Sequence, residues 1–231
     1  MRPARARNGF TMIEVMVVSG IVAAVAAIAV PAWRAVQANN RLRDAAGDVA
    51  DTLAVARARA ISSGNNFVVY FNTGLGGGTD VCGNALEDRN GNPVPILILD
   101  DGPPGGANAN CCIDAGEPVE TRPGALGVQW GVDFAANPAP GDPDPTASFA
   151  SGTTFVDPAG AQTERVAFRP DGIPAGFDDG GGAGGCTLGT TGTGSGAIYV
   201  NNDRRDMAIV LSPLGSVRVH SFERSGGAWN N

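Results

Sequence analysis

The hydrophobic pattern predicts one long helix near the start of the chain. From Val15 to Trp33 about nineteen residues carry no charge, close to the ~20 that a helix needs to cross a bilayer. Beyond this segment, apolar residues recur at alternating spacings of four and three, which is typical of an amphipathic helix with one apolar stripe. The stripe comprises Leu42, Ala46, Val49, Leu53, Ala56 and Ala60. Ser, Gly and Asn at 62–66 are typical of a helix end, so we expect a helix from Phe10 to Ser62.

The remainder of the chain has the pattern of a β-rich domain. Its apolar runs are short and rich in β-branched residues, which favours strands. The expected strands are 67–71, 96–99, 128–132, 153–156, 165–168, 197–200, 207–212 and 216–222. Pro213-Leu214-Gly215 joins the last two as a hairpin, whereas long loops rich in Gly, Pro and Asp separate the others. No internal repeat is apparent. These patterns predict an α+β protein.

The residues before the apolar segment indicate how it is oriented and processed. Residues 1–9 contain three arginines and no acidic residue, so the N-terminus is expected in the cytoplasm and the C-terminal domain outside it. An ordinary secretory signal would be cut after its apolar stretch and would lose it. Here the small residue Gly9 comes before that stretch. A cut between Gly9 and Phe10 would remove the charges and keep the helix.

Glu14 is an unusual residue for the start of an apolar helix. A carboxylate there costs several kcal/mol unless it is paired. Cutting after Gly9 would create a cationic amine on Phe10, four residues before Glu14, and the amine of a neighbouring subunit could neutralise this carboxylate. The alternative is that Glu14 merely lies at the headgroup boundary.

The stretch Gly9-Phe10-Thr11-Met12-Ile13-Glu14-Val15 resembles the type III signal of prepilins and pseudopilins, with Met12 where the family usually has Leu. The resemblance implies cleavage after Gly9 and N-methylation of Phe10 by a prepilin peptidase, and it implies that Glu14 directs subunit docking. Pro31 resembles the proline that kinks this helix in assembled pilins. The expected regions are a leader (1–9), a transmembrane and filament-core helix half (10–33), an amphipathic helix half (34–63) and an extracytoplasmic β-rich head (64–231).

A second resemblance concerns the head. The order of Arg57–Gly64, Val166–Gly172 and Gly215–Val219 is similar to that in the H-type minor pseudopilin and FimT family (GspH/FimT). It implies a long helix packed on two antiparallel sheets. It also implies a structural subunit of a type II secretion pseudopilus or a type IV pilus, which is first held in the inner membrane with its head in the periplasm. Prepilin peptidase, other pilins and a secreted substrate are the implied partners.

The alternative function is a DNA-binding minor pilin of a DNA-uptake pilus, because some FimT-like pilins bind DNA through a basic C-terminal pattern. Here Gly215-Ser216-Val217-Arg218 keeps only part of that pattern, and Arg224 adds one charge. The formal net charge of -7 disfavours nucleic acid in general. Enzymatic function finds no support in the sequence, since the single histidine, His220, lacks a nucleophile context and no P-loop or HExxH motif occurs.

Four cysteines, Cys82, Cys111, Cys112 and Cys186, favour disulfides in a domain outside the cytosol. A bond between Cys111 and Cys112 would close a strained ring, so each is expected to pair with Cys82 or Cys186. Metal binding by these cysteines is the rival interpretation, although no CxxC motif occurs.

Calcium is the one cofactor that the sequence brings into question. Asp88, Asn90 and Asn92 place oxygen side chains at alternate positions around a glycine, like the start of a calcium loop. The glutamate that completes such a loop is missing, because Leu99 stands at its position. Asp, Asn and Gly are also ordinary turn formers, and that interpretation stays open.

Overall fold

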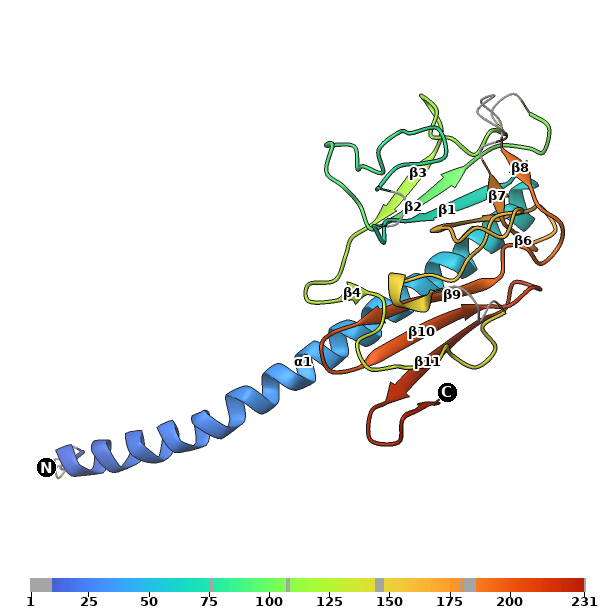
Figure 1. Cartoon of the computed structure of the whole chain (residues 1–231). Coiled ribbons are helices and arrows are strands. Elements are labelled where there is room, and N and C mark those ends of the chain that lie inside the picture. Colours follow the sequence, from blue (N-terminus) through green and yellow to red (C-terminus); the bar gives the residue numbers. More distant parts are fainter. Residues whose placement is uncertain are drawn as a thin grey trace, which may run out of the picture. The chain divides into compact units, whose positions relative to one another are not determined.

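The computed structural model describes residues 10–74, 77–106, 109–143, 148–178, 180 and 186–230. The chain divides into two compact units, Met1–Ala38 and Asn39–Asn231. The expected α+β class is confirmed, since one long helix, α1 (Met12–Ser63), precedes a β-rich region of antiparallel sheets (Figure 1). We call residues 39–231 the head.

Both ends of α1 follow from local chemistry. Thr11 precedes the first helical residue, and its Oγ1 accepts the backbone N–H of Glu14 at 3.3 Å, which satisfies one of the free donors of the first turn. Gly64 ends the helix with a φ of 74°, a left-handed conformation that glycine adopts without strain. The helix therefore begins two residues later and ends one residue later than the pattern predicts. It is continuous through Pro31.

The head contains two five-stranded antiparallel sheets. The first has the order β3 (Val119–Arg122), β2 (Ile96–Asp100), β1 (Phe67–Phe71), β5 (Arg165–Phe168) and β6 (Pro174–Ala175). The second has the order β12 (Ala228–Asn230), β11 (Val217–Glu223), β10 (Asp206–Leu211), β9 (Gly196–Asn201) and β4 (Gln129–Trp130). A two-stranded arm, β7 (Phe177–Asp178) with β8 (Thr187–Leu188), and a short 3-10 helix, η1 (Phe149–Ser151), complete the head.

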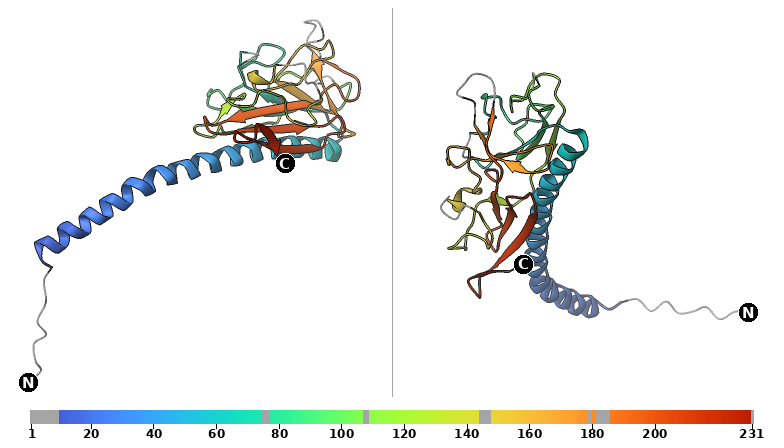
Figure 2. Two further views of the ribbon diagram at one scale, coloured as in Figure 1. Left: turned by 60° about the horizontal axis from the view of Figure 1, so that its bottom comes forward. Right: turned by 90° about the vertical axis from the view of Figure 1, so that its right-hand side faces the viewer.

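The main core lies between the second half of α1 and one face of each sheet. The predicted stripe from Leu42 to Ala60 is buried, and Figure 2 shows this part of the helix lying along the sheets. Because side chains alternate between the faces of a strand, every second residue faces the helix. In β1 these residues are Phe67, Val69 and Phe71, and in β10 they are Met207, Ile209 and Leu211.

The opposite face of each sheet is covered by long loops. Val68, Tyr70, Leu97 and Leu99 of the first sheet pack with Leu86, Val94 and Cys111 from the 77–119 region. Tyr199, Ala208 and Val210 of the second sheet pack with Ala139 and with the partly buried Phe149 and Trp229. Burial on both faces explains why β1 and β9 read as continuous apolar runs rather than alternating ones.

Some strand predictions differ from the structure. The segment 153–156 makes only single bridges, Thr153 with Ile198 and Val156 with Gln162, because it crosses the end of the sheet rather than pairing along it. Strands β3, β6, β7, β8 and β12 were not expected, since they are two to four residues long and carry no apolar run. The hairpin of β10 and β11 is confirmed.

The statement that no repeat occurs is also corrected. Two consecutive loops, from Asp80 to Asn84 and from Asp88 to Asn92, share the pattern Asp-x-x-Gly-Asn at a spacing of eight residues. In each, the aspartate N–H donates to the asparagine carbonyl at 2.8 Å. The carbonyl of Leu86 accepts the N–H of Val94, and the N–H of Leu86 donates to Gly78, so the two loops stack. A period of eight is too short to stand out by inspection.

Candidate functional site

The start of α1 presents its functional residues to the surroundings. Gly9 lies outside the described residues. Phe10 is 84% exposed, and the large apolar side chains from there to Val36 are all exposed. Among the described residues, α1 is the one helix long and apolar enough to cross a membrane, and no part of its most apolar stretch is buried. This surface therefore lacks a partner within the described chain.

Glu14 lies in the first turn of α1 and is exposed. A carboxylate is favourable near a helix N-terminus because the free N–H groups there carry partial positive charge. No hydrogen bond or ion pair is recorded for its side-chain carboxylate within the described part of the chain. The geometry thus leaves Glu14 available to an external cation, while Thr11 caps the helix below it.

The four cysteines form two disulfides in the structure, Cys82 with Cys112 and Cys111 with Cys186. This is one of the two pairings that the sequence leaves open. Cys111 has a φ of 59°, a conformation that turns the chain between the two neighbouring cysteines. Together the bridges connect two loops that cover the first sheet with the residue before β8. They leave no free thiol for a metal.

A buried carboxyl group lies beside the second disulfide. Asp101 is fully buried, one of its oxygens accepts the Cys111 N–H at 2.6 Å, and the other has no partner. Burial raises the pKa of Asp101 to about 7, and the nearby Glu117 and Asp114 raise it further while the Cys111 N–H opposes the shift. The Tyr70 hydroxyl donates to the Cys111 carbonyl, so this cluster positions the cysteine backbone.

The predicted calcium residues lie in the second of the two stacked loops. Asp88 Oδ1 accepts the N–H groups of Asn90 at 2.8 Å and Asn92 at 2.9 Å, and the Asn92 side-chain amide donates to Asp88 as well. These hydrogen bonds lower the pKa of Asp88. The carboxylate is therefore engaged as in an Asx turn, and Asn92 directs a donor, not an oxygen, toward it. Calcium stays a prediction, and no chemistry is derived from it.

The two predicted DNA-contacting arginines lie apart in function. Arg218 is exposed on β11, opposite Val210 of β10. Arg224 follows the end of β11, and its guanidinium lies 4.3 Å from the centroid of the Phe134 ring. Arg224 shares a cleft of about 520 Å³ with Arg204 and Arg205, and Arg218 is not among its lining residues.

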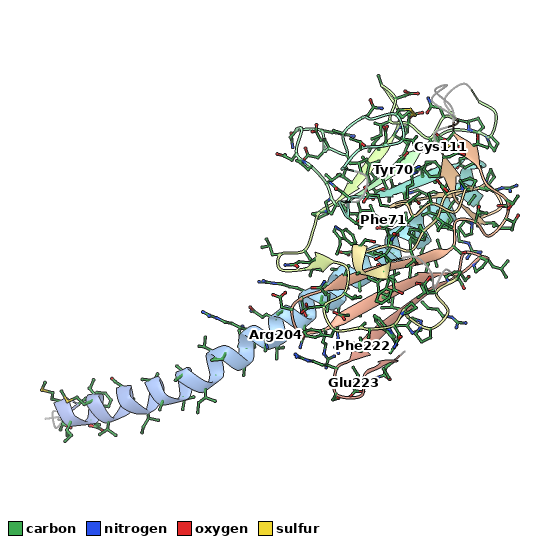
Figure 3. The ribbon with its side chains drawn as sticks, viewed as in Figure 1. Tyr70, Phe71, Cys111, Arg204, Phe222 and Glu223 are labelled. Carbon is green, nitrogen blue, oxygen red and sulfur yellow. A yellow bond between two sulfur atoms is a disulfide. The ribbon has the colours of Figure 1, made fainter. Side chains whose placement is uncertain are left out.

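We call this the arginine cleft; its lining comprises Arg204, Arg205, Ser221, Phe222, Glu223, Arg224, Ser225 and Asn230. Figure 3 shows Arg204, Phe222 and Glu223 at one end of the second sheet. Sequence reasoning missed Arg204 and Arg205. The signal was present, because Asn202-Asp203 before two arginines is a turn sequence between two apolar runs.

His220 lies on β11 and is buried, and neither ring nitrogen has a hydrogen-bond partner. Burial lowers the pKa of His220, and the charge of Arg218 lowers it further. A neutral imidazole without a partner in the described structure is not oriented for proton transfer, so this residue offers no catalytic arrangement.

Comparison with known proteins gives one match. Residues 4–30 match the family model described as the prokaryotic N-terminal methylation motif. No curated protein and no solved structure matches the chain. The matched span contains Gly9, Phe10 and Glu14. The chain therefore carries the signal of a type IV pilin-like prepilin, which identifies it as a substrate of a prepilin peptidase that assembles with other pilins.

Proposed function

We propose that this protein is a minor pilin or pseudopilin with a structural role. In this proposal the prepilin peptidase cuts between Gly9 and Phe10 and methylates Phe10. The mature subunit is held in the inner membrane by helix 10–33, with the head in the periplasm. It is then extracted into a type II secretion pseudopilus or a type IV pilus, where its head contacts neighbouring subunits or a secreted substrate.

The observation that carries the proposal is the prepilin signal at the start of an unburied apolar helix. Burial of apolar surface contributes about 25 cal/mol per Å², so an exposed apolar segment of this length requires a partner. Lipid supplies that partner before assembly, and the helices of other subunits supply it in a filament. One apolar surface thus serves both states, which is what a subunit that leaves the membrane needs.

Glu14 gives assembly its register in this proposal. A carboxylate inside an apolar filament core is unfavourable unless a cation neutralises it. The new N-terminal amine of Phe10 in an adjacent subunit is such a cation. Because this amine exists only after cleavage, an uncut subunit cannot make the pair. Processing and docking are thereby coupled through a single charge.

The head supports the finer assignment to the GspH/FimT family. Two antiparallel sheets lie beside the second half of α1, with the β10–β11 hairpin after the long central loops. This arrangement agrees with what the resemblance implies. The choice between a pilus and a secretion pseudopilus depends on the partner subunits rather than on any residue of this head.

Intact mass of the membrane-purified protein, with and without active prepilin peptidase, tests the proposal. We expect loss of residues 1–9 plus one methyl group, only with the peptidase. Gly9→Val should block the cut, whereas the matched change Asn8→Ala should permit it. A chain that stays uncut would indicate a plain single-pass membrane protein. Loss of everything through about Ala32 would indicate a secreted protein, and either result would refute the proposal.

A further inference from the structure

The turn between β9 and β10 presents two arginines on a rigid support. Asn202 Oδ1 accepts the N–H groups of Arg204 at 3.2 Å and Arg205 at 3.0 Å. Asp203 has a φ of 60°, a left-handed conformation that lets the chain reverse within this tight turn. Asn202 is buried while both arginines are exposed. The backbone is thus fixed and the two guanidinium groups face solvent.

This turn lies where the chain enters the head. The Asn202 side-chain amide donates to Oδ1 of Asn39 at 3.5 Å, and Asn39 is the first residue of the head unit. Asn39 follows Trp33, the last residue of the apolar segment, by six positions. Six residues span at most about 20 Å, whatever direction the helix takes. When the apolar segment is in a bilayer, the turn is therefore held within reach of the membrane surface.

The third arginine completes a cleft for an anion. The Phe134 ring supports the Arg224 guanidinium, and Ser221, Ser225 and Asn230 add polar side chains to the lining. Three arginines face one carboxylate, that of Glu223. Hydrogen bonds from Ser225 and Asn230 lower the pKa of Glu223, and Arg205 contributes a smaller effect. The exposed Asp203 of the same turn is not among the lining residues.

The arginine cleft differs from the rest of the head in having unpaired cations. Elsewhere in the described structure the arginines near acidic groups form ion pairs, as Arg59 and Arg122 do with Glu120. No ion pair is recorded within the described residues for Arg204, Arg205 or Arg224. In a protein of net charge -7, a local excess of positive charge is retained against the general balance and requires an external anion.

We infer that the arginine cleft binds the phosphate of an anionic phospholipid headgroup while the subunit is in the membrane. This inference rests on the proposed function, because it needs the apolar segment to span the bilayer. Arg binds phosphate oxygens through paired, planar N–H donors, and an anionic membrane surface contributes about 1 kcal/mol per nearby basic residue. The bound headgroup orients an acidic head that the same surface would otherwise repel.

Position favours lipid over nucleic acid as the occupant. A nucleic-acid site requires a basic track along several phosphates, whereas this cleft holds three arginines and the exposed Arg218 lies outside it. A lipid phosphate, in contrast, is a single anion found at the depth to which the chain holds the turn.

Hydrogen exchange of the full-length chain in lipid nanodiscs tests the inference. Discs of phosphatidylcholine alone are compared with discs that also contain phosphatidylglycerol. We expect slower exchange of peptides covering 201–206 and 221–230 in the anionic discs, by roughly fivefold for each arginine engaged. The effect should disappear in high salt and in the triple variant Arg204→Gln, Arg205→Gln, Arg224→Gln. It should persist in the control triple Arg89→Gln, Arg169→Gln, Arg218→Gln, which removes the same charge elsewhere.

Several results would overturn the inference. These are equal exchange in neutral and anionic discs, or equal loss of the effect in both triple variants. Protection by a DNA oligonucleotide in neutral discs, with none from the anionic lipid, would assign the cleft to nucleic acid. Protection that rises with the number of chains per disc, whatever the lipid, would assign it to subunit contact. A chain that the peptidase cuts but that shows no lipid effect would refute this inference alone, leaving the proposed function intact.

Discussion

The two halves of α1 belong to one helix yet bury opposite amounts of surface. From Met12 to Val36 the large apolar side chains are exposed, whereas Leu42, Ala46, Val49 and Leu53 are almost completely buried against the sheets. The first half is apolar on every side, and the second half is apolar along one stripe. A helix that is apolar all round needs an environment that surrounds it, while a helix with one stripe needs only one partner face.

The difference shows which part of the protein folds by itself and which part depends on an assembly. The second half completes the core of the head, so its residues determine the stability of that head. The first half contributes nothing to the described core and is free to exchange lipid for neighbouring helices. The same residue type should therefore have different effects at matched positions in the two halves.

The largest expected effect compares Ala46→Asp with Ala24→Asp. Ala46 is fully buried, and an unpaired buried charge costs about 3–5 kcal/mol, a large part of the roughly 5–15 kcal/mol that stabilises a domain. We expect the head of Ala46→Asp to lose its cooperative thermal transition by near-UV circular dichroism. Ala24→Asp should leave that transition unchanged and reduce membrane insertion instead. Equal damage to the head from both changes would break the distinction between the halves.

Next in size is the effect of Glu14→Gln on assembly. Removing the charge while keeping the shape should lower incorporation into sheared filaments at least ~10-fold, equivalent to about 1.4 kcal/mol, with cleavage and head unfolding unchanged. Asp44→Asn removes a carboxylate from the exposed side of the second half and serves as the control. Normal incorporation of Glu14→Gln would show that this carboxylate does not direct docking.

A smaller effect, confined to the head, concerns Asp101. Its pKa of about 7 in the folded state lies above the ordinary value near 3.9, so the folded head binds a proton that the unfolded chain has released. The stability that Asp101 contributes is therefore complete below about pH 4 and is lost as pH rises to about 7. Asp101→Asn should flatten this loss, by about 1–3 kcal/mol at pH 8 in urea unfolding. An unchanged pH profile would contradict the prediction, and Asp114→Asn is the exposed control.

The smallest predicted effect has the opposite sign and involves His220. Burial lowers its pKa in the folded state, so the unfolded chain takes up the proton more readily. Head stability should fall as pH drops below the ordinary histidine pKa of about 6.5. In His220→Leu this loss, roughly 1 kcal/mol or less, should disappear from denaturation midpoints measured between pH 5 and pH 7. A loss that persists in His220→Leu would assign the acid sensitivity to other groups.

The features that the sequence alone determined are local along the chain. An apolar run, a stripe at helical spacing and a turn between two apolar strands are each set by residues a few positions apart, because backbone hydrogen bonding and side-chain direction repeat with fixed periods. The same is true of the prepilin signal, in which Gly9, Phe10 and Glu14 lie within six residues. For this reason α1, its buried stripe and the hairpin of β10 and β11 could be predicted.

The features that only the tertiary structure decided join residues far apart. Cys111 and Cys186 are separated by 75 positions, and either cysteine of the adjacent pair could have bonded to Cys186 until the loops were placed. Arg224 meets Arg204 and Arg205 only because β10 and β11 pair in one register, since a slip of one residue would turn these side chains to other faces. Periodicity along the chain carries no information about such meetings. They depend on which surfaces pack together, and the packing of the whole head selects them.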